Sequence, residues 1–196
     1  MRDPLVNLLL AARLGDQAAA RSLWGTIAPA MTALAQSILI DHAAAEDALQ
    51  RVFCAALTLP KKRIIEIEDL TAYLAAAIRN DALNQQRDSA RRFSRERASQ
   101  RDSSATGWTD TPDANSNPDP DLARALDALS ESDREIIVLK HTASLTFEQI
   151  ALVLELNRNT IASRYRAALD RLRQNLNGDP LDKVRPAPRA EVSNAR

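Results

Sequence analysis

The chain has 196 residues, of which 45% are hydrophobic and 27% are charged, and its 26 basic residues balance its 26 acidic ones. This composition excludes a fibrous or broadly disordered protein, and zero net charge is not the strongly basic balance of a stand-alone DNA-binding protein. Only four glycines and few aromatic residues, beside abundant Ala, Leu and Arg, favour helices over strands. We therefore expect an all-α fold.

The single cysteine, Cys54, excludes an internal disulfide and a Cys-rich zinc cluster, which fits a reducing compartment. It lies in an apolar helical stretch, so we expect it to pack as a small hydrophobic residue. The apolar run near the N-terminus is interrupted by Arg13, Gly15 and Asp16 and is too short for a signal peptide or a membrane span. We expect a cytoplasmic protein with no membrane span.

Residues 1–100 are predicted to form a first domain of four helices, because apolar residues recur there at three- and four-residue spacing. Pro29 predicts a kink or break in the second helix, and Asp41 can cap the third. A basic and apolar loop, KKRIIEIE, precedes the fourth helix, which runs into seven arginines opposed by three acidic residues. The predicted helices cover about Pro4 to Leu14, Gln17 to Ile40, Asp41 to Leu59, and the region from Asp69 into the arginine run.

A flexible linker is predicted at residues 101–120, which collect Ser, Thr, Asn, Asp, Gly and Pro without an apolar period. It separates the first domain from a second one at residues 121–177, and a mobile, proline-interrupted tail follows at 178–196. Ser132 and Glu135 have the spacing of a capping box at the start of a helix. The two domains are thus expected to be small, helical and joined by a polar segment.

A helix-turn-helix is predicted within the second domain, as a short helix from Phe147 to Leu154, a turn at 155–157 and a longer helix. If Ile161 and Tyr165 face inward together with Ala168 and Leu172, the start of the longer helix faces outward. Arg binds guanine and Asn binds adenine bidentately in the major groove, while hydroxyl groups suit phosphates. The candidate DNA-binding residues there are Arg158, Asn159, Thr160, Ser163 and Arg166. A solvated basic face on an ordinary bundle remains the alternative.

We expect no enzymatic activity, no cofactor and no metal site. His42 and His141 have no partner at metal-ligand spacing, and the sequence has no glycine-rich phosphate loop or nucleophile elbow. The arginines that close the first domain, Arg91 and Arg92 among them, are either a solvated helix end or a surface for the phosphates of a separated DNA strand.

Taken together, these segments resemble the extracytoplasmic-function sigma factors of the sigma-70 family, the promoter-recognition subunits of bacterial RNA polymerase. The first motif is AAEDALQRVF at 44–53, where Glu46, Asp47, Gln50 and Phe53 match the family pattern. From the sequence pattern alone this face would be an ordinary polar surface. The resemblance implies that it binds the clamp coiled coil of the largest polymerase subunit.

A second motif lies on the predicted arginine-rich helix. It consists of Tyr73, Leu74, Arg79, Asn80, Asn84 and Arg87. The resemblance implies that this helix and the loop before it open the minus-ten promoter element and capture a flipped base of the non-template strand. Unstacking a base costs a few kcal/mol, which the pocket and the basic helix must offset.

The third motif is EQIA followed by Leu154, Asn157, Thr160, Ile161, Ser163 and Arg164. The resemblance implies that the recognition helix docks in the minus-thirty-five element and that a neighbouring surface holds the polymerase flap. We therefore predict a sigma factor that acts in transcription initiation, with core RNA polymerase and promoter DNA as partners and an anti-sigma protein left open. The alternatives are a conventional helix-turn-helix regulator that acts without core, and a degenerate sigma-like interaction protein.

Overall fold

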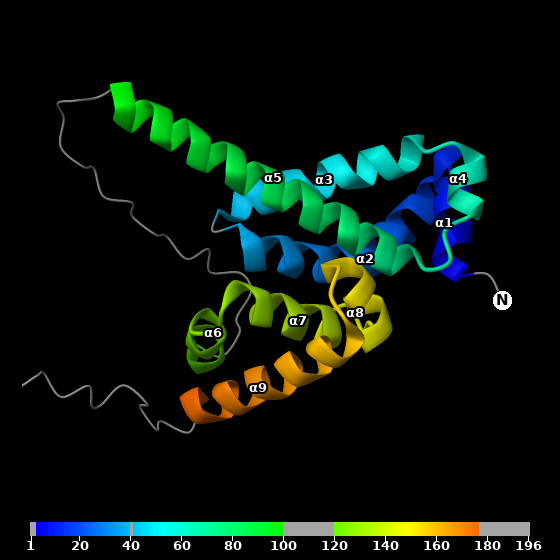
Figure 1. The fold of residues 1–196 in the computed structure, drawn as a ribbon. Helices are drawn as coiled ribbons and strands as arrows, with labels where there is room; N and C mark the ends of the chain where they lie inside the picture. Colours follow the sequence, from blue (N-terminus) through cyan, green and yellow to red (C-terminus); the bar gives the residue numbers. More distant parts are fainter. Residues whose placement is uncertain (1–2, 40, 100–119, 177–196) are drawn as a thin grey trace, which may run out of the picture.

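The computed structural model describes residues 3–39, 41–99 and 120–176, without the side chains of 93–99 and 120. Every secondary-structure element in these ranges is an α-helix, which confirms the predicted fold class (Figure 1). None of these helices combines the length and the apolar character that a bilayer crossing requires. The helices are α1 (Pro4–Arg13), α2 (Gln17–Ile38), α3 (His42–Thr58), α4 (Lys61–Ile65), α5 (Leu70–Ser99), α6 (Pro120–Asp127), α7 (Glu131–His141), α8 (Phe147–Leu154) and α9 (Arg158–Leu176).

Aspartates start the first three helices. Asp3, Asp16 and Asp41 each accept a hydrogen bond from a backbone N–H of the following turn, and these donors have no partner within the helix. The predicted cap at Asp41 is confirmed. Helices α1, α2, α3 and α5 then pack their apolar faces into one core, so that Leu9, Leu23 and others are fully buried.

Two local features of the first domain differ from the sequence prediction or narrow it. Helix α2 continues through Pro29, so a break is excluded and the alternative, a kink, stays a prediction; packing along its buried face holds the rest of the helix. The predicted loop KKRIIEIE begins with a short helix, α4, whose Ile64 is fully buried. Burial of that one apolar side chain favours a helical turn where the mixed local sequence predicted none.

The second domain contains α6 to α9. Its helix-turn-helix is confirmed: α8 and α9 are joined by a turn in which Glu155 adopts the left-handed conformation (φ 54°) that ends α8.

The capping box predicted at Ser132 and Glu135 is wrong. Ser130 is the residue with an extended backbone before α7, and its side chain accepts from the N–H of Asp133. The capping box of this domain is formed by Thr146 and Gln149 at the start of α8.

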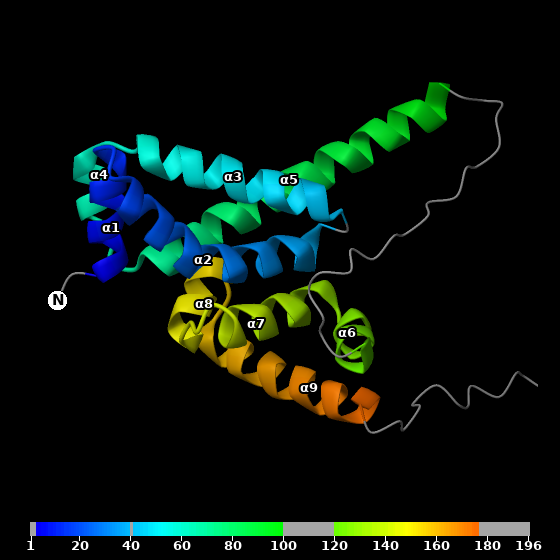
Figure 2. The same cartoon turned by 180° about the vertical axis from the view of Figure 1, so that it is seen from behind.

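The two domains pack against each other. Helix α7 lies along α2, and α8 contacts α5, whereas α9 lies on the far side of the second domain (Figures 1 and 2). One continuous apolar cluster contains buried residues from both domains, including Leu34 and Ile78 from the first and Ile136 and Ile150 from the second. The predicted linker at 101–120 and tail at 178–196 lie, apart from Pro120, outside the described residues, and the predicted domain boundaries stay predictions.

The expectation that Cys54 packs in the core is wrong, because its side chain is exposed. The buried face of α3 is formed by Ala45, Ala48, Leu49 and Ala56. Cys54 lies between Leu49 and Ala56 at spacings that turn it away from the core, so the apolar composition of the stretch was a poor guide to the burial of this residue.

Candidate nucleic-acid interface

The first half of α9 presents the side chains that were predicted to bind DNA. Ile161, Ala168 and Leu172 are buried and Tyr165 is half-buried against Phe147, so the predicted inward face is confirmed. Asn157 starts the helix by accepting a hydrogen bond from the N–H of Asn159 at 2.8 Å. The exposed residues at this end are Arg158, Asn159, Thr160, Ser163, Arg164 and Arg166.

Local contacts orient the arginines of α9. Arg158 pairs with Glu148 at the start of α8. The pKa of Glu148 is lowered by a hydrogen bond that its carboxylate accepts from its own backbone N–H and then by the hydrogen bond from Arg158. Arg164 donates to the hydroxyl of Ser132 on α7 at 2.6 Å, and Arg166 donates to a backbone carbonyl one turn earlier. The cationic groups therefore project from a rigid helix-turn-helix and not from a loop.

A second exposed surface runs along α5. Tyr73, Asn80, Asn84, Arg87 and Arg91 are all exposed, and they recur at three-, four- and seven-residue intervals. Residues with these intervals lie on one side of an α-helix. We call this set the α5 stripe. It has an aromatic ring at its N-terminal end, two amides in the middle and two arginines towards the arginine-rich C-terminal end of the helix.

Arg92 is exposed but follows Arg91 directly, so it points to a different side of α5 from the stripe. The structure thus separates two neighbouring arginines that the sequence placed in one group. Arg91 also contacts Asp88, at 3.7 Å.

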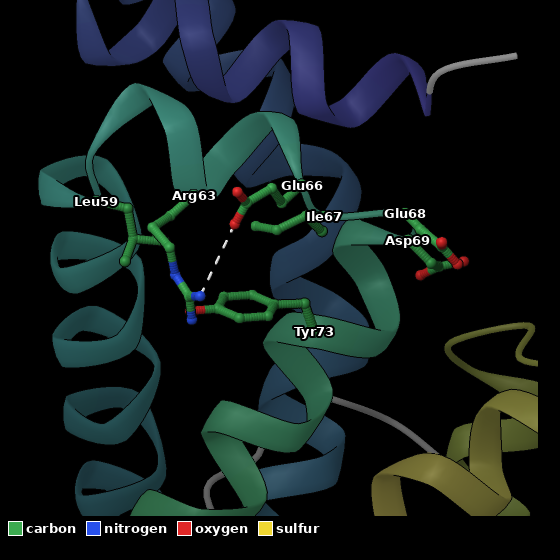
Figure 3. A pocket seen from close by; sticks show the side chains of 7 residues that line it. All are labelled: Leu59, Arg63, Glu66, Ile67, Glu68, Asp69 and Tyr73. Atoms are coloured by element: carbon green, nitrogen blue, oxygen red, sulfur yellow. Dashed lines mark ion pairs between the residues drawn. The ribbon is translucent and has the colours of Figure 1, made fainter.

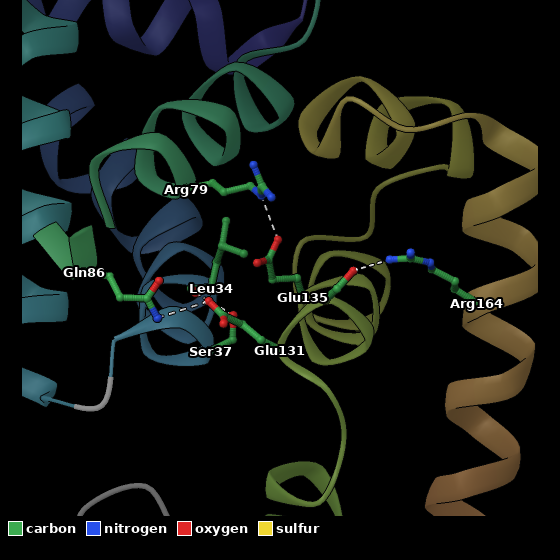
Figure 4. A network of polar contacts seen from close by, with 8 residues as sticks. Leu34, Ser37, Arg79, Gln86, Glu131, Glu135 and Arg164 are labelled. Carbon is green, nitrogen blue, oxygen red and sulfur yellow. Dashed lines mark hydrogen bonds and ion pairs between the residues drawn. The ribbon is translucent and has the colours of Figure 1, made fainter. Parts of the chain in front are cut away.

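Arg79 points to a different side of α5 from the other predicted DNA-binding residues of this helix. Its guanidinium turns towards the second domain, where its Nε lies 2.7 Å from a carboxylate oxygen of Glu135 on α7 (Figure 4). The Glu135 side chain is only 4% exposed. Its pKa is raised, because the effect of burial outweighs the opposing effect of the hydrogen bond from Arg79. Arg79 and Asn80, adjacent in the motif, therefore lie on different faces of α5.

A pocket of about 290 Å³ lies at the start of α5 (Figure 3). Arg63 from α4 and Tyr73 from α5 point into the same space, and Arg63 lies 3.8 Å from the carboxylate of Glu66. The sequence indicated Tyr73 and the loop before α5 but not Arg63 or Glu66, since only the short helix α4 brings them to Tyr73. The lining residues are Leu59, Arg63, Glu66, Ile67, Glu68, Asp69 and Tyr73.

The acidic face predicted to bind polymerase is accessible. Glu46, Asp47 and Gln50 are all exposed on α3. The guanidinium of the neighbouring Arg51 binds Asp81 of α5 at 2.8 Å, and the pKa of Arg51 is raised by this hydrogen bond and also by the charges of Asp81 and Asp47. The described part of the chain contains no group of His, Cys, Asp and Glu side chains that could hold a metal ion.

Two family models match the chain. The model of Sigma-70 region 2 matches residues 23–92, and the model of Sigma-70, region 4 matches residues 125–174. The chain belongs to the sigma-70 family, with the two-region organisation of extracytoplasmic-function sigma factors. Region 2 of this sigma factor contains the acidic face and the α5 stripe, and region 4 contains the helix-turn-helix. Members of this family are transcription factors and not enzymes.

Two solved structures are similar to this sigma factor. The sigma factor RpoE of Bartonella quintana, in complex with the anti-sigma factor NepR, is 27% identical, with 81% of this chain and 97% of that chain covered and a TM-score of 0.64. CnrH, in complex with the cytosolic domain of CnrY, is 22% identical, with 90% and 99% covered and a TM-score of 0.58, which shows the same fold. A search of curated proteins found no match.

Proposed function

We propose that this sigma factor binds core RNA polymerase and directs it to promoters, where region 2 opens the minus-ten element and region 4 holds the minus-thirty-five element. The observation that carries the proposal is the α5 stripe, which starts at the pocket beside Tyr73 and continues to Arg91 on the exposed side of region 2. An aromatic ring followed by amides and arginines suits a separated DNA strand, with a base on the ring and phosphates on the arginines.

Strand opening requires at least one base to leave the duplex stack, at a cost of a few kcal/mol. Stacking a base on an aromatic ring contributes about 1–3 kcal/mol, and each arginine adds a phosphate contact. Tyr73 and Arg87 are separated by about four helical turns, so a strand along α5 would meet the ring first and the arginines several nucleotides later. The pocket beside Tyr73 is the proposed position of the flipped base.

Recognition of the duplex is assigned to the exposed start of α9. Arg158 and Asn159 stand at its N-terminus, the end of a recognition helix that reaches base edges in the major groove. Thr160, Ser163 and Arg166 supply phosphate contacts around them. Two weak sites on one chain then act together, because binding at one raises the effective concentration at the other.

The acidic face of Glu46, Asp47 and Gln50 is assigned to core polymerase. Its three side chains are exposed, and the neighbouring Arg51 directs its hydrogen bond to Asp81 of α5. An acidic surface of this kind favours a basic partner surface, mainly by raising the association rate. By the likeness to RpoE with NepR, an anti-sigma protein is a further proposed partner, and action on polymerase and DNA assigns the chain to the cytoplasm.

The test adds the purified chain to sigma-free core polymerase with the source genome's DNA as template. We expect discrete transcript starts that share two spaced upstream motifs. Core binding without starts would favour the degenerate interaction protein, and DNA binding without core binding would favour a conventional regulator. A variant with Glu46→Lys and Asp47→Lys should lose core binding and starts together, while Asp170→Lys, an exposed acidic residue of region 4 that pairs with Arg173 of its own helix, keeps core binding and serves as the control.

A further inference from the structure

The first arginine of helix α9 is held by a carboxylate from the other helix of the helix-turn-helix. Nε of Arg158, the first residue of α9, donates to Oε1 of Glu148, the second residue of α8. The two residues are ten positions apart, and the turn at 155–157 brings them together. Both side chains remain largely exposed, at 57% and 60%. The pair therefore lies on the surface that region 4 presents to a partner and not in its core.

The guanidinium atom that makes this contact decides what Arg158 can still bind. A guanidinium has one Nε–H and two terminal amino groups, and bidentate binding of guanine needs two donors, for O6 and N7. Within the described residues, Arg158 makes its contact through Nε alone, so both terminal groups remain available. The carboxylate thus restrains the arginine from the side and leaves its tip for a base.

The other two arginines of this surface are bound differently. Arg164 uses a terminal nitrogen, Nη1, to donate to the hydroxyl of Ser132 on α7 at 2.6 Å, so its tip is turned towards its own domain (Figure 4). Arg166 donates through Nε to a neutral group, the backbone carbonyl of Ala162, at 3.1 Å. Of the three, Arg158 is the one that combines an available tip with a negatively charged partner.

The charge of Glu148 favours a base over a phosphate as the partner of Arg158. A phosphate at the tip of Arg158 would also approach the carboxylate, and the repulsion between the two anions offsets part of the attraction. The O6 and N7 atoms of guanine are neutral acceptors and meet no such repulsion. The carboxylate is ionised at neutral pH, because hydrogen bonds from its own backbone N–H and from Arg158 lower the pKa of Glu148.

Restraint of Arg158 before binding also lowers the entropic cost of recognition. A free arginine side chain samples many rotamers, and ordering it during binding weakens the complex. Glu148 is well placed to impose this order, because it lies in the first turn of α8, within the capping box of Thr146 and Gln149. An exposed ion pair adds little to the stability of a domain, so the importance of this pair lies in the geometry that it imposes.

We propose that Glu148 is a positioning residue, which holds Arg158 for bidentate contact with one guanine in the minus-thirty-five element and so sets the base preference at that position. The inference rests on the proposed function, because it requires the start of α9 to lie in the major groove of promoter DNA. It adds a base identity to that function, and it assigns a role to a residue of α8 that acts through Arg158.

The test measures base preference with the holoenzyme. Core polymerase carrying each variant selects binding sites from a library in which the minus-thirty-five element, located from the transcript starts, is randomised. The parent chain should prefer guanine, on one strand, at one position by roughly tenfold or more, and Arg158→Ala should abolish that preference. Glu148→Ala should lower the preference several-fold at the same position. Glu148→Gln, which keeps an acceptor oxygen for Nε, should lower it by less.

An arginine–carboxylate pair elsewhere on α9 supplies the matched control. Asp170 pairs with Arg173 at 3.3 Å, and both side chains are exposed. Asp170→Ala removes the same charge as Glu148→Ala, but at a distance from the start of α9. It should leave the guanine preference unchanged.

Two further readouts separate positioning from a structural defect. Non-specific duplex binding by the Glu148→Ala holoenzyme should be unchanged or stronger, because a negative charge next to the DNA is lost. Damage to the fold of region 4 would instead weaken specific and non-specific binding together. In an Arg158→Ala background, Glu148→Ala should change the base preference no further, since its effect passes through that arginine.

A full guanine preference in Glu148→Ala, with an unchanged circular dichroism spectrum, would overturn the positioning role. If the alanine variant does not fold, a full preference in Glu148→Gln would overturn it equally. A preference that survives Arg158→Ala would also refute the inference, while the proposed function stands because the holoenzyme still selects a sequence. If the parent holoenzyme selects no sequence at this element, the proposed role of region 4 fails, and the inference fails with it.

Discussion

Helices α5 and α9 both carry arginines at high density, yet the structure uses them differently. Helix α9 lies on the far side of region 4, so its polar start is exposed to solvent and only its apolar face packs. Helix α5 lies between α3 and the second domain. On one side its Asp81 pairs with Arg51 of α3, on another its Arg79 pairs with Glu135 of α7, and a third side forms the exposed stripe. The role of an arginine on these helices follows from the side of the helix that it occupies.

The largest expected effect concerns the buried side of α5. Ile78→Ala removes a fully buried side chain from the cluster that both regions share, so it should lower the free energy of unfolding by about 2–5 kcal/mol. Urea denaturation followed by circular dichroism measures it. Leu152→Ala on α8, where the side chain is 78% exposed, is the control and should change stability by less than about 0.5 kcal/mol. Similar losses in both variants would contradict the shared core.

The exposed start of α9 is tested by Arg158→Ala combined with Arg166→Ala. Each base or phosphate contact is worth about 1–3 kcal/mol, so promoter binding by the holoenzyme should weaken on the order of a hundredfold while core binding is unchanged. Arg173→Ala removes the same charge from the other end of α9 and serves as the control. An equal loss of core and promoter binding in the double variant would refute the assignment of α9 to DNA.

The α5 stripe predicts a difference between arginines of one helix. Arg87→Ala removes a stripe residue and should lower the slope of log affinity against log salt by about one, with a roughly tenfold weaker open complex. Arg92→Ala removes the same charge from another side of the same helix and should have a smaller effect. If both substitutions change the salt slope equally, general positive charge and not the stripe accounts for DNA binding.

The smallest effect is expected at the side of α5 that faces α3. Arg51 and Asp81 form an ion pair at 2.8 Å, but their side chains are 49% and 29% exposed. Solvent screens such a pair, so Arg51→Ala should cost less than about 1 kcal/mol of stability. A double-mutant cycle with Asp81→Ala isolates the coupling energy. A coupling well above that limit would show that the pair fixes α3 against α5.

Where a prediction depended only on local periodicity, it was confirmed. The all-helical fold, the cap at Asp41, the turn before α9 and the inward face of Ile161 all follow from the spacing of apolar and capping residues. The start of α7 shows the limit of this reasoning, since Ser130 and Ser132 both precede an acidic residue at a capping distance. Only the backbone conformation, extended at Ser130, decides between them.

The sequence by itself therefore determined the family, most of the helices and the set of charged residues that we propose to bind DNA or polymerase, because these depend on residue type and on the helical period. Only the tertiary structure decided that Arg79 faces Glu135, that Cys54 is exposed, and that Arg63 and Tyr73 share a pocket. Those outcomes depend on which side of a helix meets a neighbour that is distant in the chain. Periodicity alone does not specify that neighbour, since long-range packing selects it.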